Sequence, residues 1–285
     1  DTLSQKDEFK ILEYNQFLTA VIDYYQNKSV TISQVETSLS VSMFRDQLNK
    51  YIYSLTLEDL EYVTESVEII DGHLPITYNQ KVERIIKFFQ NEGRKTFQSW
   101  LNRMNKYKTI ILPILEQEGL PPEIFYLAMI ESGLNPKAYS YAHASGIWQF
   151  ISSTGKQYGL DKTYWIDERR DFIKSTYAAS KYLKSLYRHY DDWYLAFAAY
   201  NCGQSRVDKA IRFHKSRDYW KLYRLPSQTK NYVPNIMAAI IIATNPEKYG
   251  FLILSEPNFD WEEKKIDKTV SLEVISKCAN IDIKT

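Results

Sequence analysis

The sequence predicts a mainly α fold. Apolar residues recur at three- and four-residue steps through most of the 285 residues, which is the spacing of one face of a helix. No segment shows the alternation of apolar and polar residues that indicates a half-buried strand. Residues 1–70 contain neither Gly nor Pro, so no such residue interrupts a helix in this part of the chain.

The first expected helices are amphipathic and cover 7–26, 33–53 and 56–66. The segment 70–75, with the sequence Ile-Asp-Gly-His-Leu-Pro, then breaks the pattern. We place a domain boundary at this break. Nothing in the residues before it indicates a chemical function.

Helical periodicity resumes over 77–118 and ends at the segment 119–122, Gly-Leu-Pro-Pro, where a new helix opens with proline in its first turn. Residues 133–170 are expected to be irregular, with short helices. The charged run 167–171 would bind substrate if it lay in a cleft, but the favoured interpretation is a structural ion-pair network with a helix cap at its end. The later predicted helices are 172–190 with Asp171 as its cap, 192–202, 204–214, 227–245, and a small helix that begins within 270–275.

Composition excludes several classes of function. The chain is 44% hydrophobic and 25% charged with a net charge of +1, so no basic field attracts nucleic acid. No run of 18 apolar residues exists that would cross a membrane. The two Cys and four His show no metal-ligand spacing, so no metal or other cofactor is expected. The first residue is Asp rather than Met, so a signal peptide or lipid anchor would be missing from this chain.

Glu131 is the residue that most strongly suggests a function. It lies near the end of the predicted helix 121–133, and Ile124, Leu127 and Ala128 share its face. A carboxyl group on an apolar face loses water, which favours its protonated form, and a protonated acid can give a proton to a leaving group. The alternative is a Glu in the last helical turn that bends into solvent.

Four neighbouring features supply the hydroxyls, amide and aromatic faces that a polysaccharide cleft requires. They are Ser132 with the Asn-Pro that follows it, Ser140, the segment 146–150 (Gly-Ile-Trp-Gln-Phe) and the segment 198–203 (Ala-Ala-Tyr-Asn-Cys-Gly). Structural alternatives exist, because 146–150 also fits a core turn around a buried Trp and Gly203 fits the residue that ends a helix. The order and spacing of the four features are more specific than any one of them.

This combination resembles the lytic murein transglycosylases, and most closely their membrane-bound type D subgroup. Trp148 stands where many relatives carry Met, which is the type D variant. The matching motifs are Leu74-Pro75 with Tyr78, Gly119 to Glu123, Glu131 to Gly133, Asn135-Pro136 with Ala138 and Ser140, Ala144 to Phe150, Tyr158 to Leu160, Asp167 to Asp171, Asp192-Trp193, Ala198 to Asn201 with Gly203, and Tyr232 to Pro234.

The resemblance implies that Glu131 is the catalytic acid. It would protonate the glycosidic oxygen between N-acetylmuramic acid and N-acetylglucosamine, and then accept the proton of the C6 hydroxyl as a 1,6-anhydro ring closes without water. Ordinary glycosidases use two carboxylates, whereas the matched motifs contain no second one in a catalytic position. The substrate-binding residues implied by the resemblance are Ser132, Ser140, Gln149, Phe150, Tyr200, Asn201 and Tyr232.

The implied organisation is a lysozyme-like helical catalytic domain over 74–250, an added N-terminal helical region over 1–73, and a tail over 251–285 that would begin a truncated extension. The implied enzyme is a carbon–oxygen lyase that acts on peptidoglycan strands in the periplasm or envelope, with any lipid anchor outside this chain. Residues 1–73 are expected to be a helical docking or support region, with glycan binding or contact with another cell-wall protein as the alternatives, and no oligomeric state is predicted. Two alternatives remain open: a lysozyme-like hydrolase that uses water, and a non-catalytic cell-wall-binding module.

Overall fold

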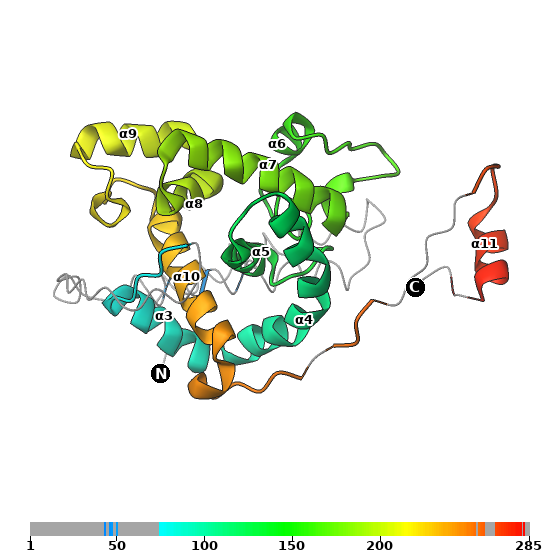
Figure 1. The fold of residues 1–285 in the computed structure, drawn as a ribbon, viewed down its shortest axis with the longest axis horizontal. Coiled ribbons are helices and arrows are strands. Elements are labelled where there is room, and N and C mark those ends of the chain that lie inside the picture. The colour runs from blue at the N-terminus through cyan, green and yellow to red at the C-terminus, as the bar shows by residue number, and fades with distance from the viewer. Residues whose placement is uncertain are drawn as a thin grey trace, which may run out of the picture.

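The computed structural model describes residues 74–254, 256–259, 266–280 and 282, together with Met43, Asp46, Gln47 and Lys50. These residues are mainly helical and form no strand, so the predicted mainly α fold class is confirmed for the described part of the chain (Figure 1). The four described positions within the predicted helix 33–53 are helical. The predicted helices over 7–26 and 56–66 lie outside the described residues.

The helices lie close to the predicted positions. The long stretch 77–118 is divided into two helices by a turn at 91–93, and the expected helix 121–133 starts with a short 3-10 turn over Pro122–Ile124. The helices are α3 (Gln80–Gln90), α4 (Arg94–Gln117), α5 (Phe125–Ser132), α6 (Ser152–Gln157), α7 (Phe172–Tyr190), α8 (Trp193–Cys202), α9 (Gln204–His214), α10 (Ser227–Thr244) and α11 (Leu272–Ala279).

Aspartate caps fix the starts of two central helices. Asp171 Oδ1 accepts hydrogen bonds from the backbone amides of Ile173 and Lys174, each at 2.9 Å, and so satisfies two amides that have no partner inside α7. Asp192 does the same for α8 through the amide of Leu195 at 2.9 Å. The predicted cap at Asp171 is therefore confirmed, and the starts of α7 and α8 are fixed by local chemistry.

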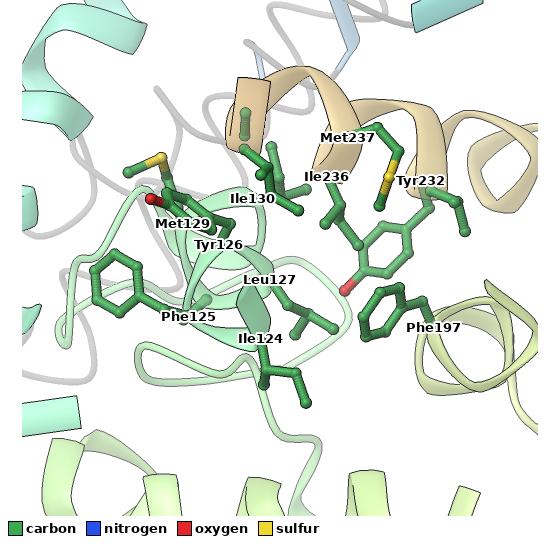
Figure 2. Close-up of a cluster of buried hydrophobic side chains, with 14 of the residues drawn as sticks. Ile124, Phe125, Tyr126, Leu127, Met129, Ile130, Phe197, Tyr232, Ile236 and Met237 are labelled. Atoms are coloured by element: carbon green, nitrogen blue, oxygen red, sulfur yellow. The ribbon is translucent and has the colours of Figure 1, made fainter. Parts of the chain in front are cut away.

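The core is built around α5. All eight of its side chains are buried, and it packs against α4 and α10. Figure 2 shows Leu127 of α5 near Ile236 of α10, with Phe197 of α8 beside the ring of Tyr232. Because α5 has no exposed face, any polar side chain on it must find its partner inside the protein.

The chain after α10 continues to pack against the helical body. The amide of Glu256 donates to the carbonyl of Asn102 in α4 at 3.0 Å, and the ring of Phe259 stacks on Phe172 with centroids 5.1 Å apart. In contrast, α11 buries none of its residues. The boundary expected at residue 250 remains a prediction, but contacts with the helical body extend to Phe259.

Gly133 ends the helix that carries Glu131. Its φ of 60° lies in the left-handed region, and its amide donates to the carbonyl of Met129 at 2.8 Å. A Cβ atom at this position would lie 2.2 Å from Nε1 of Trp100. The position therefore requires glycine both for its backbone conformation and for the close approach of Trp100.

We expect Gly133→Ala to destabilise the protein strongly. The left-handed conformation costs a residue with a side chain roughly 1 kcal/mol, and overpacking against Trp100 adds roughly 1–3 kcal/mol. Gly119→Ala is the matched control, because Gly119 has a φ of 62° but nothing within 4 Å of a Cβ atom. Urea unfolding should show the larger loss for Gly133→Ala, and equal losses would contradict the role given to Trp100.

Candidate active site

A cavity of about 370 Å³ opens beside the end of α5. Its walls come from α5, from the segment 138–151 that follows it, from the end of α8 and from the start of α9. Asp46, from the N-terminal region, also lines it. Six of the eight predicted site residues line this cavity: Glu131, Ser140, Gln149, Phe150, Tyr200 and Asn201.

Glu131 combines burial with access to the cavity. Its side chain is only 6% exposed, yet it forms part of the cavity wall. Tyr232, on α10, donates a hydrogen bond from its hydroxyl to Oε1 of Glu131. Figure 2 shows Tyr232 reaching from α10 towards the α5 side of the core. The tyrosine therefore holds one carboxyl oxygen and fixes the direction of the other.

Tyr200 forms the next part of the wall and remains protonated at neutral pH. Burial raises the pKa of its hydroxyl well above the ordinary value, and the nearby charge of Glu131 raises it further. The hydroxyl donates to the backbone carbonyl of Trp148 at 2.7 Å. Its ring lies 5.1 Å from that of Tyr182 and 6.3 Å from that of Phe150, which gives the cavity an aromatic side. Tyr200 thus ties α8 to the segment that carries Gln149.

Gln149 is held in an unusual backbone conformation. Its φ is 50°, and its side-chain Nε2 donates to the carbonyls of Gly146 at 2.8 Å and Ala138 at 3.2 Å. These bonds leave the side-chain oxygen without a hydrogen bond from the described residues. A left-handed residue other than Gly is often found at a functional site. Here the constraint presents an acceptor on the cavity wall.

Asn201 and Ser140 are also held by the protein. Asn201 Oδ1 accepts a hydrogen bond from the hydroxyl of Thr229 at 2.7 Å, which leaves its amide nitrogen as a donor on the cavity wall. Ser140 Oγ accepts from the amide of Ala144 at 3.1 Å, so its hydroxyl hydrogen remains available to a ligand. Together with Gln149, these residues provide both donors and acceptors, as a sugar with hydroxyl and acetamido groups requires.

Arg169 holds the cavity segment in place from behind. This side chain is 1% exposed, and its Nη1 donates to the carbonyls of His143 and Phe150, each at 2.8 Å. Its Nε and Nη2 pair with the carboxylate of Asp167 at 2.8 and 2.6 Å. The ion-pair network predicted over 167–171 is therefore present, and it braces the segment that carries Ser140 and Gln149.

Two predicted substrate-binding residues lie behind the cavity instead. Ser132 is fully buried, and its Oγ lies 2.8 Å from the carbonyl of Ile147 and accepts from the amide of Asn135 at 3.2 Å. Because Ser132 directly follows Glu131 on the helix, its side chain points away from the face of Glu131 and towards the backbone of Ile147 and Asn135. Tyr232 is 4% exposed and engaged with Glu131. Neither residue is among those that line the cavity, and their contact with substrate stays a prediction.

Several cavity residues were not predicted from the sequence. Tyr182 projects from the middle of α7, where its spacing indicates only a core position. Arg206 lies in the first turn of α9, five residues after Asn201, and this short spacing was a usable signal. The other unpredicted polar or large side chains on the wall are Asp46, Tyr139, Tyr141, Ile151, Thr154, Cys202 and Gln228.

Comparison with known families is consistent with this arrangement. Residues 108–223 match the family described as the Transglycosylase SLT domain. The chain is similar to this family over less than half of its length. The matched segment contains all six cavity residues named above, whereas Tyr232 lies beyond it. The hydrogen bond to Glu131 thus reaches it from a helix outside the SLT match.

Relatives of known name match part of the chain. The membrane-bound lytic murein transglycosylase D of Escherichia coli K12 is 42% identical over 153 residues, as is that of E. coli O6:H1 strain CFT073. The match covers 52% of this chain but only 34% of either relative. A protein of Alteromonas sp. strain M-1 named for tributyltin chloride resistance is 35% identical over 136 residues, covering 47% of this chain and 66% of that protein. The resemblance inferred from the motifs is confirmed.

A solved structure was also found. It is that of an inactive mutant of the lytic transglycosylase Slt of Pseudomonas aeruginosa, with a TM-score of 0.41 and 21% identity. The match covers 57% of this chain and 27% of that one.

Two further observations concern only the described part of the chain. No group of three His, Cys, Asp or Glu side chains there is placed to hold a metal ion. No helix there is sufficiently long and apolar to span a membrane.

We expect Arg169→Lys to destabilise the protein by about 2 kcal/mol or more, because Lys cannot make the bidentate pair and the two carbonyl bonds together. Urea unfolding measures the loss. Arg170→Lys is the control. Arg170 donates from Nε to the hydroxyl of Ser145 at 3.1 Å and lies over the ring of Tyr139, without a bidentate ion pair to any described residue, so its replacement should cost less. Equal losses for the two variants would contradict the bracing role.

The ion pair between Asp167 and Arg169 predicts that the stability of the protein depends on pH. Burial alone would raise the pKa of Asp167, but the hydrogen bonds and charge of Arg169 outweigh it and hold this pKa below its ordinary value of 3.8. The ion pair between Asp167 and Arg169 therefore adds to the free energy of unfolding above pH 3.8. This stabilisation is lost as the pH falls through the lower pKa that Asp167 has in the folded protein. The stability difference between wild type and Arg169→Lys should shrink over that range.

Proposed function

We propose that this chain is a peptidoglycan lytic transglycosylase that cleaves the β-1,4 bond between N-acetylmuramic acid and N-acetylglucosamine. One observation carries the proposal: within the segment that matches the SLT domain family, Glu131 is buried against Tyr232 and opens on a cavity with Ser140, Gln149 and Asn201. The names of the E. coli relatives support this substrate, and they also support a location in the bacterial envelope.

In the proposed reaction Glu131 acts first as an acid. Because Tyr232 donates to Oε1, the proton transfer is assigned to Oε2. Glu131 gives this proton to the glycosidic oxygen, and the N-acetylglucosamine leaves as an alcohol. The 2-acetamido oxygen of the muramoyl sugar stabilises the positive charge that develops at C1. Ser140 and Gln149 are placed to orient that acetamido group.

Glu131 then acts as a base. Its carboxylate takes the proton of the C6 hydroxyl of the same muramoyl sugar, and O6 attacks C1 to close the 1,6-anhydro ring. No water is added, and Glu131 returns to its starting protonated form. The high pKa of Tyr200 keeps its hydroxyl a donor and makes it unsuitable as the base, so both proton transfers fall to Glu131.

The hydrolase alternative would use a second carboxylate to activate water. Asp46 is the other carboxylate among the described residues that line the cavity, so it is the residue this alternative would require. The non-catalytic alternative is opposed by the intact hydrogen-bonded acid. Protein partners of residues 1–73, a lipid anchor and the roles of the expected parts 1–73, 74–250 and 251–285 remain proposals.

We expect Glu131→Gln to reduce release of muropeptides from purified sacculi by about 100- to 10,000-fold, because loss of a general acid and base has effects of this size. The amide keeps the shape of the side chain and can still accept from Tyr232, so thermal unfolding should change little. Mass spectrometry of the wild-type products should show 1,6-anhydro ends.

The same experiment separates the alternatives. Reducing ends from the wild type, together with inactivity of Asp46→Asn, would support the hydrolase instead. Full activity of Glu131→Gln would exclude Glu131 as the acid. Binding to sacculi without any release of muropeptides would support the non-catalytic module.

We also expect Tyr232→Phe to lower kcat by roughly tenfold with a smaller change in KM, because the lost hydrogen bond, worth about 1 kcal/mol, orients the acid and does not bind substrate. Tyr194→Phe is the control. Its hydroxyl donates to the carbonyl of Pro75 at 2.7 Å, away from the cavity, so the stability loss should be similar while kcat is retained. An unchanged kcat in Tyr232→Phe would contradict the positioning role.

A further inference from the structure

The cavity contains a single positive charge among the described residues that line it. This charge belongs to Arg206, in the first turn of α9, and the carboxyl groups on the wall are those of Glu131 and Asp46. Arg206 is exposed and forms no ion pair with any described residue. A guanidinium group is therefore presented to whatever enters the cavity.

The guanidinium is oriented by the end of the preceding helix. Nη1 donates to the carbonyl of Cys202 at 3.0 Å, which holds the head group beside the cavity wall formed by Asn201 and Cys202. A guanidinium carries five N–H donors, and this bond uses one of them. The remaining donors keep the planar fork that matches a carboxylate.

A neutral sugar does not require such a group. Hydroxyl and acetamido groups are served by the amides and hydroxyls of the cavity, and sugar faces by its aromatic rings. In peptidoglycan, however, every second sugar is muramic acid, which carries a lactyl arm at C3. That arm ends in a carboxylate, or in a stem peptide that has carboxylates of its own.

We propose that Arg206 recognises a carboxylate on the muramic acid arm and thereby makes the cavity prefer acidic glycan strands to neutral ones of equal length. This inference rests on the proposed function, because it takes the substrate from it. Arg206 follows Tyr200 and Asn201 closely in the chain, so the acidic arm lies along the wall formed by α8 and α9. Ser140 and Gln149 contact the sugar from the segment 138–151.

Binding is measured in Glu131→Gln protein, which does not consume the ligand. Three ligands are compared: a neutral tetramer of N-acetylglucosamine, a murein tetrasaccharide with free lactyl groups, and the same tetrasaccharide with stem peptides. Adding Arg206→Gln should raise Kd for one or both acidic ligands by roughly tenfold, as expected for a lost charge-assisted hydrogen bond. The change for the neutral tetramer should be much smaller. Added salt should weaken the binding of the acidic ligands only in protein that retains Arg206.

The comparison of the three ligands identifies which carboxylate Arg206 binds. A loss with both acidic ligands assigns the contact to the lactyl group, and a loss confined to the peptide-bearing ligand assigns it to the stem. Arg206→Lys should recover part of the affinity, since it restores the charge without the fork. Arg212→Gln, an exposed arginine of α9 that does not line the cavity, should leave all three Kd values unchanged.

Two results would overturn the inference. One is an equal rise in Kd for all three ligands, which would indicate a general packing role for Arg206. The other is no change for either acidic ligand. Failure of the proposed function would look different, because the wild-type protein would then release no anhydro muropeptides from sacculi, whatever Arg206 does.

Discussion

The hydrogen bond from Tyr232 to Glu131 joins two helices across 101 positions of the chain. It exists because α5 is buried on every side, so its one acidic side chain cannot be hydrated by turning outward. A buried carboxyl group without a partner is costly. The partner must come from another element, and α10 provides it by packing directly against α5. The position of the acid thus depends on the packing of the core.

A second buried polar group organises the opposite part of the site. Arg169 adds to the backbone hydrogen bonds of the irregular segment 138–151 by donating to two of its carbonyls, and Asp167 compensates its charge. A charge at 1% exposure is tolerated only when it is paired and fully hydrogen-bonded. Glu131 is therefore held by Tyr232, and the segment that carries Gln149 is held by Arg169, so the cavity is formed before any ligand enters.

The sequence predicted the parts of this arrangement that depend on local chemistry. The bounds of α7 and α9 follow from periodicity and from turn residues such as Asp171, which act within one or two turns of the helix. Glu131 and Gln149 were found because their motifs are contiguous. Ser132 and Tyr232 were assigned to substrate on the family resemblance. Their partners within the protein, Ile147 and Glu131, are selected by tertiary packing, which no local pattern records.

Most polar atoms around the cavity already form hydrogen bonds within the protein. The donors and acceptors that remain determine which groups a ligand must carry. Gln149 has used its donors and keeps an acceptor, whereas Asn201 has used its acceptor and keeps a donor. A ligand that carries an N–H and a carbonyl in one group can meet both needs, and an acetamido group does so. Water could satisfy each atom singly, but it would not exploit their fixed relative placement. The committed hydrogen bonds thus suit an N-acetylated sugar, and they would set its orientation relative to Glu131, the proposed proton donor.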